Sequence, residues 1–206
     1  MSVAIVTAWK DHLELAPDYF RAVEEAVPDQ LVIVDDGSDP ALEFAAVRLD
    51  ESLGFSGANN VGLEQVETDI TLFLNNDVAQ MRQGWLQEIT NLVEPGVLVA
   101  PLRFDAHGMV DGELYPYGDG WCLAGLTSEL RELGGWDEVY DRAGPAYYSD
   151  NALSFQARLR GFTIREVRPG LLHKGGQTGG VDLDLFNKAI AVNKEIFAGQ
   201  VRAALK

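Results

Sequence analysis

The chain has 206 residues and carries 32 Asp and Glu against 16 Lys and Arg, a net charge of -16 at neutral pH. A field of this sign repels nucleic-acid phosphates and anionic membrane surfaces, which argues against both as partners. Cys122 is the single cysteine, so a disulfide within the chain is excluded, and no apolar run approaches the length that spans a bilayer. We therefore expect a soluble, cytoplasmic protein of one α/β domain.

Strands and helices alternate at short intervals over the first hundred residues. Apolar, β-branched runs predict buried strands at 3–8, 31–34, 47–49, 70–74 and 97–100. Helical spacing predicts helices at 17–27, from a cap at Ser56 to about residue 67, and at 85–93. This order is typical of a Rossmann-like, mainly parallel α/β sheet flanked by helices, and such sheets bind ligands at the carboxyl ends of their strands.

The second half of the chain is less regular. Residues 103–120 are rich in Gly, Asp, Tyr and Pro and predict an irregular loop or hairpin. We expect helices at 126–133 and 149–160, and strands at 162–167 and 171–173. Residues 174–180 include four glycines and predict a mobile loop.

A final helix is predicted over residues 183–205, because apolar side chains recur there at helical spacing. We expect this helix to pack on the sheet of its own chain, and a homodimer contact is the alternative. Its predicted face comprises Phe186, Ile190, Asn193, Phe197, Val201 and Leu205.

Two polar clusters follow predicted strands. Asp35 and Asp36 come after the second strand, where a carboxylate can accept a hydrogen bond from a nucleotide base or a ribose hydroxyl; a solvated turn is the other interpretation. Asp77 follows Asn75 and Asn76 after the fourth strand. Its oxygens suit Mg²⁺ or Mn²⁺, and a strand-end cap is the alternative.

Other polar positions also have both a chemical and a structural interpretation. His173 suits Mn²⁺ better than Mg²⁺, although a lone histidine is often structural, and Lys174 beside it suits either a phosphate or solvent. Asp150 begins a predicted helix, either as its cap or as a general base for an acceptor hydroxyl. The small residues around Asn59 and Asn60, at a helix N-terminus, allow close approach of an anion.

The order of these clusters is more specific than any one of them. Along the chain they are Asp35-Asp36, Gly-Phe-Ser-Gly-Ala-Asn-Asn-Val-Gly at 54–62, Leu-Asn-Asn-Asp at 74–77, Gly-Gly-Trp-Asp-Glu at 134–138, Asp150, and His-Lys-Gly-Gly at 173–176. This ordered set resembles glycosyltransferase family 2, and it looks most like the rhamnosyltransferase-like branch. The resemblance implies a GT-A fold that binds a nucleotide-diphosphate sugar.

The resemblance also implies a role for each cluster. Asp77 would be the metal-binding member of an Asp-X-Asp position, with His173 helping to hold the metal, Mn²⁺ or Mg²⁺, or the diphosphate. Asp150 would be the catalytic base of an inverting transfer to an acceptor hydroxyl, and the loop at 175–180 would close over the donor. The residues expected to bind the nucleotide sugar are Thr7, Asp35, Asp36, Asn59, Asn60, Asn75 and Asn76.

The same resemblance divides the chain by function and leaves alternatives open. Residues 1–100 would form the nucleotide-sugar-binding half, 101–180 the acceptor and catalytic half, and 181–206 the C-terminal helix. Asn75 stands where the family has the first Asp of Asp-X-Asp, and Ser149 stands where it has a Glu before the base. A nucleotide-sugar-binding module without catalysis, or a structural protein that retains the fold, is therefore the alternative function.

Overall fold

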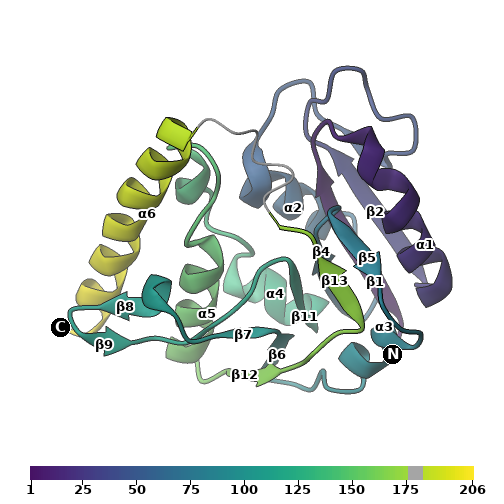
Figure 1. Ribbon diagram of the computed structural model, residues 1–206. Helices are drawn as coiled ribbons and strands as arrows, with labels where there is room; N and C mark the ends of the chain where they lie inside the picture. The colour runs from purple at the N-terminus through teal and green to yellow at the C-terminus, as the bar shows by residue number, and fades with distance from the viewer. Residues whose placement is uncertain (176–182) are drawn as a thin grey trace.

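The computed structural model describes residues 1–175 and 183–206, which form a sheet with helices on both faces (Figure 1). The described residues form a seven-stranded sheet whose order is β12 (Thr163–Glu166), β6 (Val97–Ala100), β11 (Cys122–Leu126), β4 (Ile70–Leu74), β1 (Val3–Trp9), β2 (Gln30–Asp35) and β3 (Val47–Arg48). Neighbouring strands are parallel except around β11, which runs antiparallel to both β4 and β6. The predicted mainly parallel α/β sheet is confirmed.

The central strands are apolar along their whole length because both faces of the sheet are covered. In β1, Ile5 belongs to one core cluster and Val6 to the other. Val6 pairs with Val32 of β2 and with Phe73 of β4, which places β1 inside the sheet. Strands that are buried on both faces read as continuous apolar runs, and this is why the sequence predicts them.

Helices complete the two outer layers. One face is covered by α1 (Ala16–Ala26) and α3 (Trp85–Thr90), and the other by α2 (Gly54–Glu64), α4 (Thr127–Leu133) and α5 (Ser149–Leu159). Tyr19 and Trp85 are fully buried on the first face, and Leu63 and Leu130 are buried on the second. Burying a large apolar side chain contributes about 1.5–3 kcal/mol. Within the described residues, no helix has the length and apolar character needed to cross a membrane.

Short elements fill the connections. The two-stranded pairs are β5 (Val78–Gln80) with β13 (Leu171–His173), β7 (Leu102–Arg103) with β10 (Tyr117–Gly118), and β8 (Met109–Val110) with β9 (Glu113–Leu114). The 3-10 turns are η1 (Leu13–Leu15), η2 (Ala106–Gly108) and η3 (Glu138–Asp141). The region predicted as an irregular loop or hairpin therefore contains two small antiparallel pairs, β7–β10 and β8–β9.

Strand β11 has no counterpart among the predicted strands. Its sequence, Cys-Leu-Ala-Gly-Leu, lacks β-branched residues, and four of its five residues are buried, so neither propensity nor alternation marks it. It pairs with β4 from Cys122 opposite Leu74 to Leu126 opposite Ile70. The segment that leads into β11 therefore lies beside the carboxyl end of β4.

The prediction that Ser56 caps α2 is wrong. The helix begins at Gly54, so Ser56 lies inside the first turn, where it is fully buried. Its backbone N–H donates to Asp141 at 3.1 Å, and the N–H groups of Leu53 and Gly54 donate to Asp36 at 2.6 and 3.1 Å. Carboxylates from two other segments therefore cap this helix, where negative charge is favourable.

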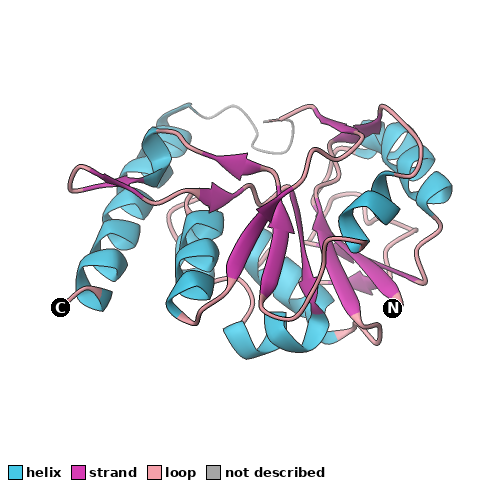
Figure 2. Cartoon of the chain, turned by 90° about the horizontal axis from the view of Figure 1, so that it is seen from below, coloured by secondary structure: helices cyan, strands magenta, loops and turns pink. Residues whose placement is uncertain are grey.

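Helix α6 (Leu183–Ala204) stands on the opposite side of the molecule from α1 (Figure 1). Phe197 and Val201 pack in a cluster with Phe155 of α5 and with Tyr140, so the prediction that α6 packs on the sheet is wrong. The sheet faces are already covered by the preceding helices, and Figure 2 shows α6 beyond them, next to α5. The homodimer contact stays a prediction.

Candidate active site

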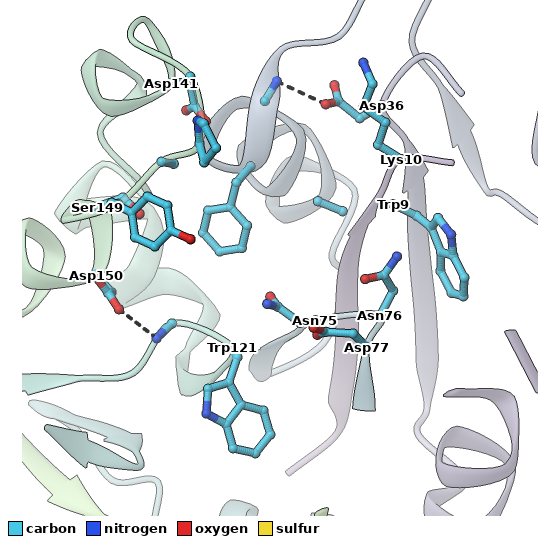
Figure 3. A pocket seen from close by; sticks show the side chains of 18 of the residues that line it. Trp9, Lys10, Asp36, Asn75, Asn76, Asp77, Trp121, Asp141, Ser149 and Asp150 are labelled. Atoms are coloured by element: carbon cyan, nitrogen blue, oxygen red, sulfur yellow. Dashed lines mark hydrogen bonds between the residues drawn. The ribbon is translucent and has the colours of Figure 1, made fainter. Parts of the chain in front are cut away.

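A cleft of about 720 Å³ opens at the carboxyl edge of the sheet. One part of its wall comes from the ends of β1, β2 and β4, and the other from the segments before β11 and α5. Figure 3 shows Lys10 and Asp36 on one side of the cleft, Asp141, Ser149 and Asp150 on the other, and Asn75, Asn76 and Asp77 below Lys10 and Asp36. The position agrees with the expected ligand edge of the sheet.

Two short strands bring Asp77 and His173 together. Strand β5 begins directly after Asp77, and its antiparallel partner β13 places His173 opposite Val78. The backbone N–H of Lys174 donates to the carbonyl of Asp77 at 2.9 Å. His173 Nε2 consequently lies 3.1 Å from Asp77 Oδ1.

Three buried polar atoms near this point have no hydrogen-bond partner in the described part of the chain: Asp77 Oδ1, His173 Nε2 and Asn76 Nδ2. The first two are close, but their orientation does not give a directed hydrogen bond. Buried polar atoms are nearly always partnered in folded proteins, so unpartnered atoms lining a cleft indicate a ligand. An imidazole nitrogen facing a carboxylate oxygen fits a cation such as Mn²⁺, and the Asn76 amide is a donor for an anionic oxygen.

The N-terminus of α2 is occupied by carboxylates of the chain itself. Besides capping the helix, Asp36 accepts a hydrogen bond from Ser52 Oγ at 2.6 Å. A Cβ on Gly54, which has a φ of +80°, would lie 2.4 Å from Asp141 Oδ1, so glycine permits the approach of Asp141. Burial raises the pKa of Asp141 to about 6. The helix N-terminus at which an anion was expected to bind is therefore already filled.

Asp150 lies across the cleft from Lys10 and Asp36 (Figure 3). Its Oδ2 accepts a hydrogen bond from the Gly120 N–H at 3.2 Å, and its Oδ1 accepts one from the Asn151 N–H at 2.9 Å. Burial raises the pKa of Asp150 to about 7, and the Asp119 carboxylate adds to this rise. A carboxylate that changes charge near neutral pH and faces a cleft is suited to general-base chemistry.

Two of the residues expected to bind the nucleotide, Thr7 within β1 and Asp35 at the end of β2, do not line the cleft. Thr7 is fully buried, with its Oγ1 2.6 Å from the hydroxyl of Tyr19. Asp35 accepts hydrogen bonds from the N–H groups of Ser38 and Leu42 and pairs with Arg48. Burial acts to raise the pKa of Asp35, but these hydrogen bonds and the Arg48 charge outweigh it, and the pKa lies below its ordinary value. Both side chains thus have structural partners.

The two asparagines of α2 also have hydrogen-bond partners within the chain. Asn59 Nδ2 donates to the Phe55 carbonyl at 2.9 Å within the helix. Asn60 bonds both backbone groups of Trp136, donating to its carbonyl at 2.8 Å and accepting from its N–H at 2.8 Å. Neither lines the cleft. Of the expected binding residues, Asp36, Asn75, Asn76, Asp77, Asp150 and His173 meet there.

The cleft is strongly acidic. Five aspartates line it: Asp36, Asp77, Asp119, Asp141 and Asp150. Among the described lining residues, Lys10 is the one lysine or arginine. Lys174 lies outside the lining and pairs with Asp18 at 2.7 Å. An anionic ligand therefore needs added positive charge to bind in this cleft.

Two acidic lining residues, Asp119 and Asp141, had no role in the sequence-based prediction. Asp119 and Trp121 precede β11, and their place is visible only once that strand is known. Asp141 follows the Gly-Gly-Trp-Asp-Glu motif, which marks the region but not the contact with α2. The loop expected to close over the cleft lies, beyond Gly175, outside the described residues.

Together the sheet order, the covering helices and the position of the cleft define a fold of the GT-A glycosyltransferase type. No family model and no curated protein matches the sequence. The structure of TarS from S. aureus has a TM-score of 0.58 and 15% identity, covering 81% of this chain and 35% of TarS, so the chain spans about a third of that protein.

A second solved structure is similar along nearly the whole chain. The mannosyltransferase PcManGT from Pyrobaculum calidifontis, solved in complex with GDP-Man and Mn²⁺, has a TM-score of 0.62 and 13% identity. The alignment covers 98% of this chain and 73% of PcManGT. At these identities the likeness concerns the fold, and activity has to be argued from the cleft.

Proposed function

We propose that this protein is an inverting, metal-dependent glycosyltransferase, which moves a sugar from a nucleotide-diphosphate sugar to an acceptor hydroxyl. The observation that carries the proposal is the trio of unpartnered buried atoms on Asn76, Asp77 and His173, which share a cleft with the half-buried Asp150 carboxylate. The ordered motifs further support a hexosyl or deoxyhexosyl donor, as in the rhamnosyltransferase-like branch that they resemble.

Asp77 and His173 are the residues that would hold the metal. The described residues contain no group of three or more His, Cys, Asp or Glu side chains suited to a metal, so the diphosphate and water would supply the other ligands. When bound, Mn²⁺ or Mg²⁺ would neutralise the departing diphosphate. PcManGT was solved with GDP-Man and Mn²⁺ together, which supports the proposal that a nucleotide sugar and a metal bind together in this cleft. The acidic lining supports it as well, because Lys10 alone cannot balance a diphosphate.

Asp150 acts as the base in this proposal. The acceptor oxygen attacks the anomeric carbon while its proton passes to the Asp150 carboxylate. The bond from the anomeric carbon to the diphosphate oxygen breaks, and its electron pair leaves with the nucleotide. The N–H groups of Gly120 and Asn151 hold the carboxylate in place for the transfer.

We also propose where the protein is located, which residues contact the donor and how the chain could form a dimer. The acidic net charge and the single cysteine support a cytoplasmic location and a partner other than nucleic acid. Asn75 and Asn76 would contact the donor from the end of β4. A homodimer through α6 is compatible with the exposed side chains of Leu183, Val192 and Leu205.

Thermal unfolding with UDP, GDP, dTDP, CDP and ADP, each with and without Mn²⁺, tests donor binding. A ligand at about 100 times its Kd adds about 2.7 kcal/mol to stability, so a metal-dependent rise in Tm with one base is expected. Asp77→Asn should abolish the Mn²⁺ dependence, whereas Asp50→Asn, at an exposed carboxylate outside the cleft, should not.

Hydrolysis of the matching nucleotide sugar then separates the functions. Asp150→Asn should keep the Tm rise and slow donor turnover by about a hundredfold or more. Donor binding without turnover in the unmodified protein would favour the non-catalytic binding module. No Tm rise with any diphosphate would favour the structural protein.

A further inference from the structure

The indole of Trp121 is stacked on the imidazole of His173. The ring centroids are 4.8 Å apart and the planes differ by 10°. Trp121 is 8% exposed and directly precedes β11, and its carbonyl accepts a hydrogen bond from the Asn75 N–H at 2.9 Å. The backbone of Trp121 is thus tied to the end of β4, while its side chain lies against the histidine.

The His173 side chain belongs to a short strand pair and lines the cleft. The histidine ends the three-residue strand β13, which pairs with the three-residue β5 outside the main sheet. An imidazole turns easily about its terminal torsion. Metal-binding histidines are usually held by a hydrogen bond from the second ring nitrogen to a carbonyl or carboxylate. Within residues 1–175 and 183–206, the ring of His173 contacts Asp77 and Trp121 but makes no such bond.

We propose that Trp121 is a positioning residue for the cation site, because its flat face fixes the ring plane of His173 and keeps Nε2 turned toward Asp77 Oδ1. The inference rests on the proposed function, since it takes the Asp77–His173 pair as cation ligands. The role requires a flat side chain at position 121. A role in core packing alone would require only apolar volume.

Two substitutions separate a flat face from apolar volume. Trp121→Phe keeps an aromatic ring, and Trp121→Met keeps an adaptable apolar side chain without one. We expect Trp121→Met to raise the Kd for Mn²⁺ by about tenfold, the size typical of losing a group that orients a metal-binding histidine, and Trp121→Phe to raise it much less. The probe is Mn²⁺ alone, with free Mn²⁺ measured by electron paramagnetic resonance. Tm values without metal report the packing loss of each variant.

A double-mutant cycle shows whether the effect acts through His173. In a His173→Ala background, Trp121→Met should not weaken Mn²⁺ binding further. Equal Mn²⁺ affinity of Trp121→Met and the unmodified protein overturns the inference, and so does the same tenfold loss in the His173→Ala background. If the unmodified protein itself does not bind Mn²⁺, the proposed metal site fails and the inference fails with it, which distinguishes the two cases.

Discussion

The backbone N–H of Gly120, in the turn that leads into β11, donates a hydrogen bond of 3.2 Å to Oδ2 of Asp150 at the start of α5. The approach depends on the missing side chain. A Cβ at position 120 would lie 3.0 Å from the ring of Trp136 and 3.2 Å from the Cβ of Asp150. The proposed base, Asp150, therefore contacts the backbone at Gly120, where a larger residue would clash with its neighbours.

Gly120→Ala should displace Asp150 and lower both activity and stability. Crowding of this kind in a packed region should lower the free energy of unfolding by about 1–3 kcal/mol, and urea unfolding is the measurement that checks it. Gly199→Ala is the matched control, because a Cβ there meets open space within helix α6 and alanine favours a helix by about 0.8–1 kcal/mol over glycine. Equal stability and turnover of Gly120→Ala and the unmodified protein would contradict the proposed support of Asp150.

The transfer rate should rise as the pH increases through about 7, because Asp150 has a pKa of about 7 and must be deprotonated to accept a proton. Burial is the main cause of this raised pKa, and Asp119 is the second. Asp119→Asn should therefore lower the pKa of Asp150 and move the acid limb of the profile to lower pH.

Arg103→Gln provides the opposite change. Arg103 Nε lies 2.6 Å from Asp119 Oδ2 and partly offsets its charge, so its removal should move the acid limb to higher pH. The measurement is kcat/KM against pH for the three proteins. Shifts in the same direction for both variants would argue against a role for Asp119 in setting the pKa of Asp150.

Asp141 makes the stability of the fold depend on pH. Its folded-state pKa of about 6 lies above the ordinary value for Asp, so the folded state binds a proton that the unfolded state has released. This contribution to stability is complete below the unfolded pKa of about 4 and is lost as the pH rises through about 6. In Asp141→Asn, the free energy of unfolding from urea titrations between pH 5 and 7 should fall less steeply with pH. If the free energy of unfolding of Asp141→Asn depends on pH as steeply as that of the unmodified protein, Asp141 is not the source of the pH dependence.

Asn193 ties α6 to the cleft wall. It is fully buried, and its Nδ2 donates to the carbonyl of Tyr140 at 2.8 Å and to that of Pro145 at 3.4 Å. Asn193→Ala leaves these carbonyls without their donor and should lower the free energy of unfolding by about 1–3 kcal/mol. Asn187→Ala, at an exposed position of the same helix, should change it by about 0.5 kcal/mol or less. Equal losses in the two variants would mean that the buried contact does not support the wall.

Much of the sheet could be predicted from the sequence because its parallel strands are continuous apolar runs. Val3 to Ala8 and Ile70 to Leu74 carry this signal, and the structure places strands there. Strand β11 could not be predicted in the same way. Its residues, none of which is β-branched, are stabilised by two neighbouring strands, and that stabilisation depends on the tertiary structure.

The candidate site was predictable at the strand ends but not in the direction of each side chain. Asp36 and Asp77 reach the cleft, whereas Thr7 in β1 and Asp35 at the end of β2 have partners inside the fold. Adjacent strand residues point to opposite faces, so an error of one position changes the role. Asp141 depends on a contact with α2 between segments far apart in the chain, which no local pattern shows.

The pairing of β11 with β4 also sets the spacing between the two halves of the proposed reaction site. Asn75, at the end of β4, is bonded to Trp121, and Gly120 next to it is bonded to Asp150. The site proposed for the leaving group thus lies at the end of β4, and the proposed base at the start of α5 is hydrogen-bonded to the segment that leads into the neighbouring strand β11. We expect the spacing between nucleophile and leaving group to be built into the folded chain, so that binding need not close one domain upon another to create it.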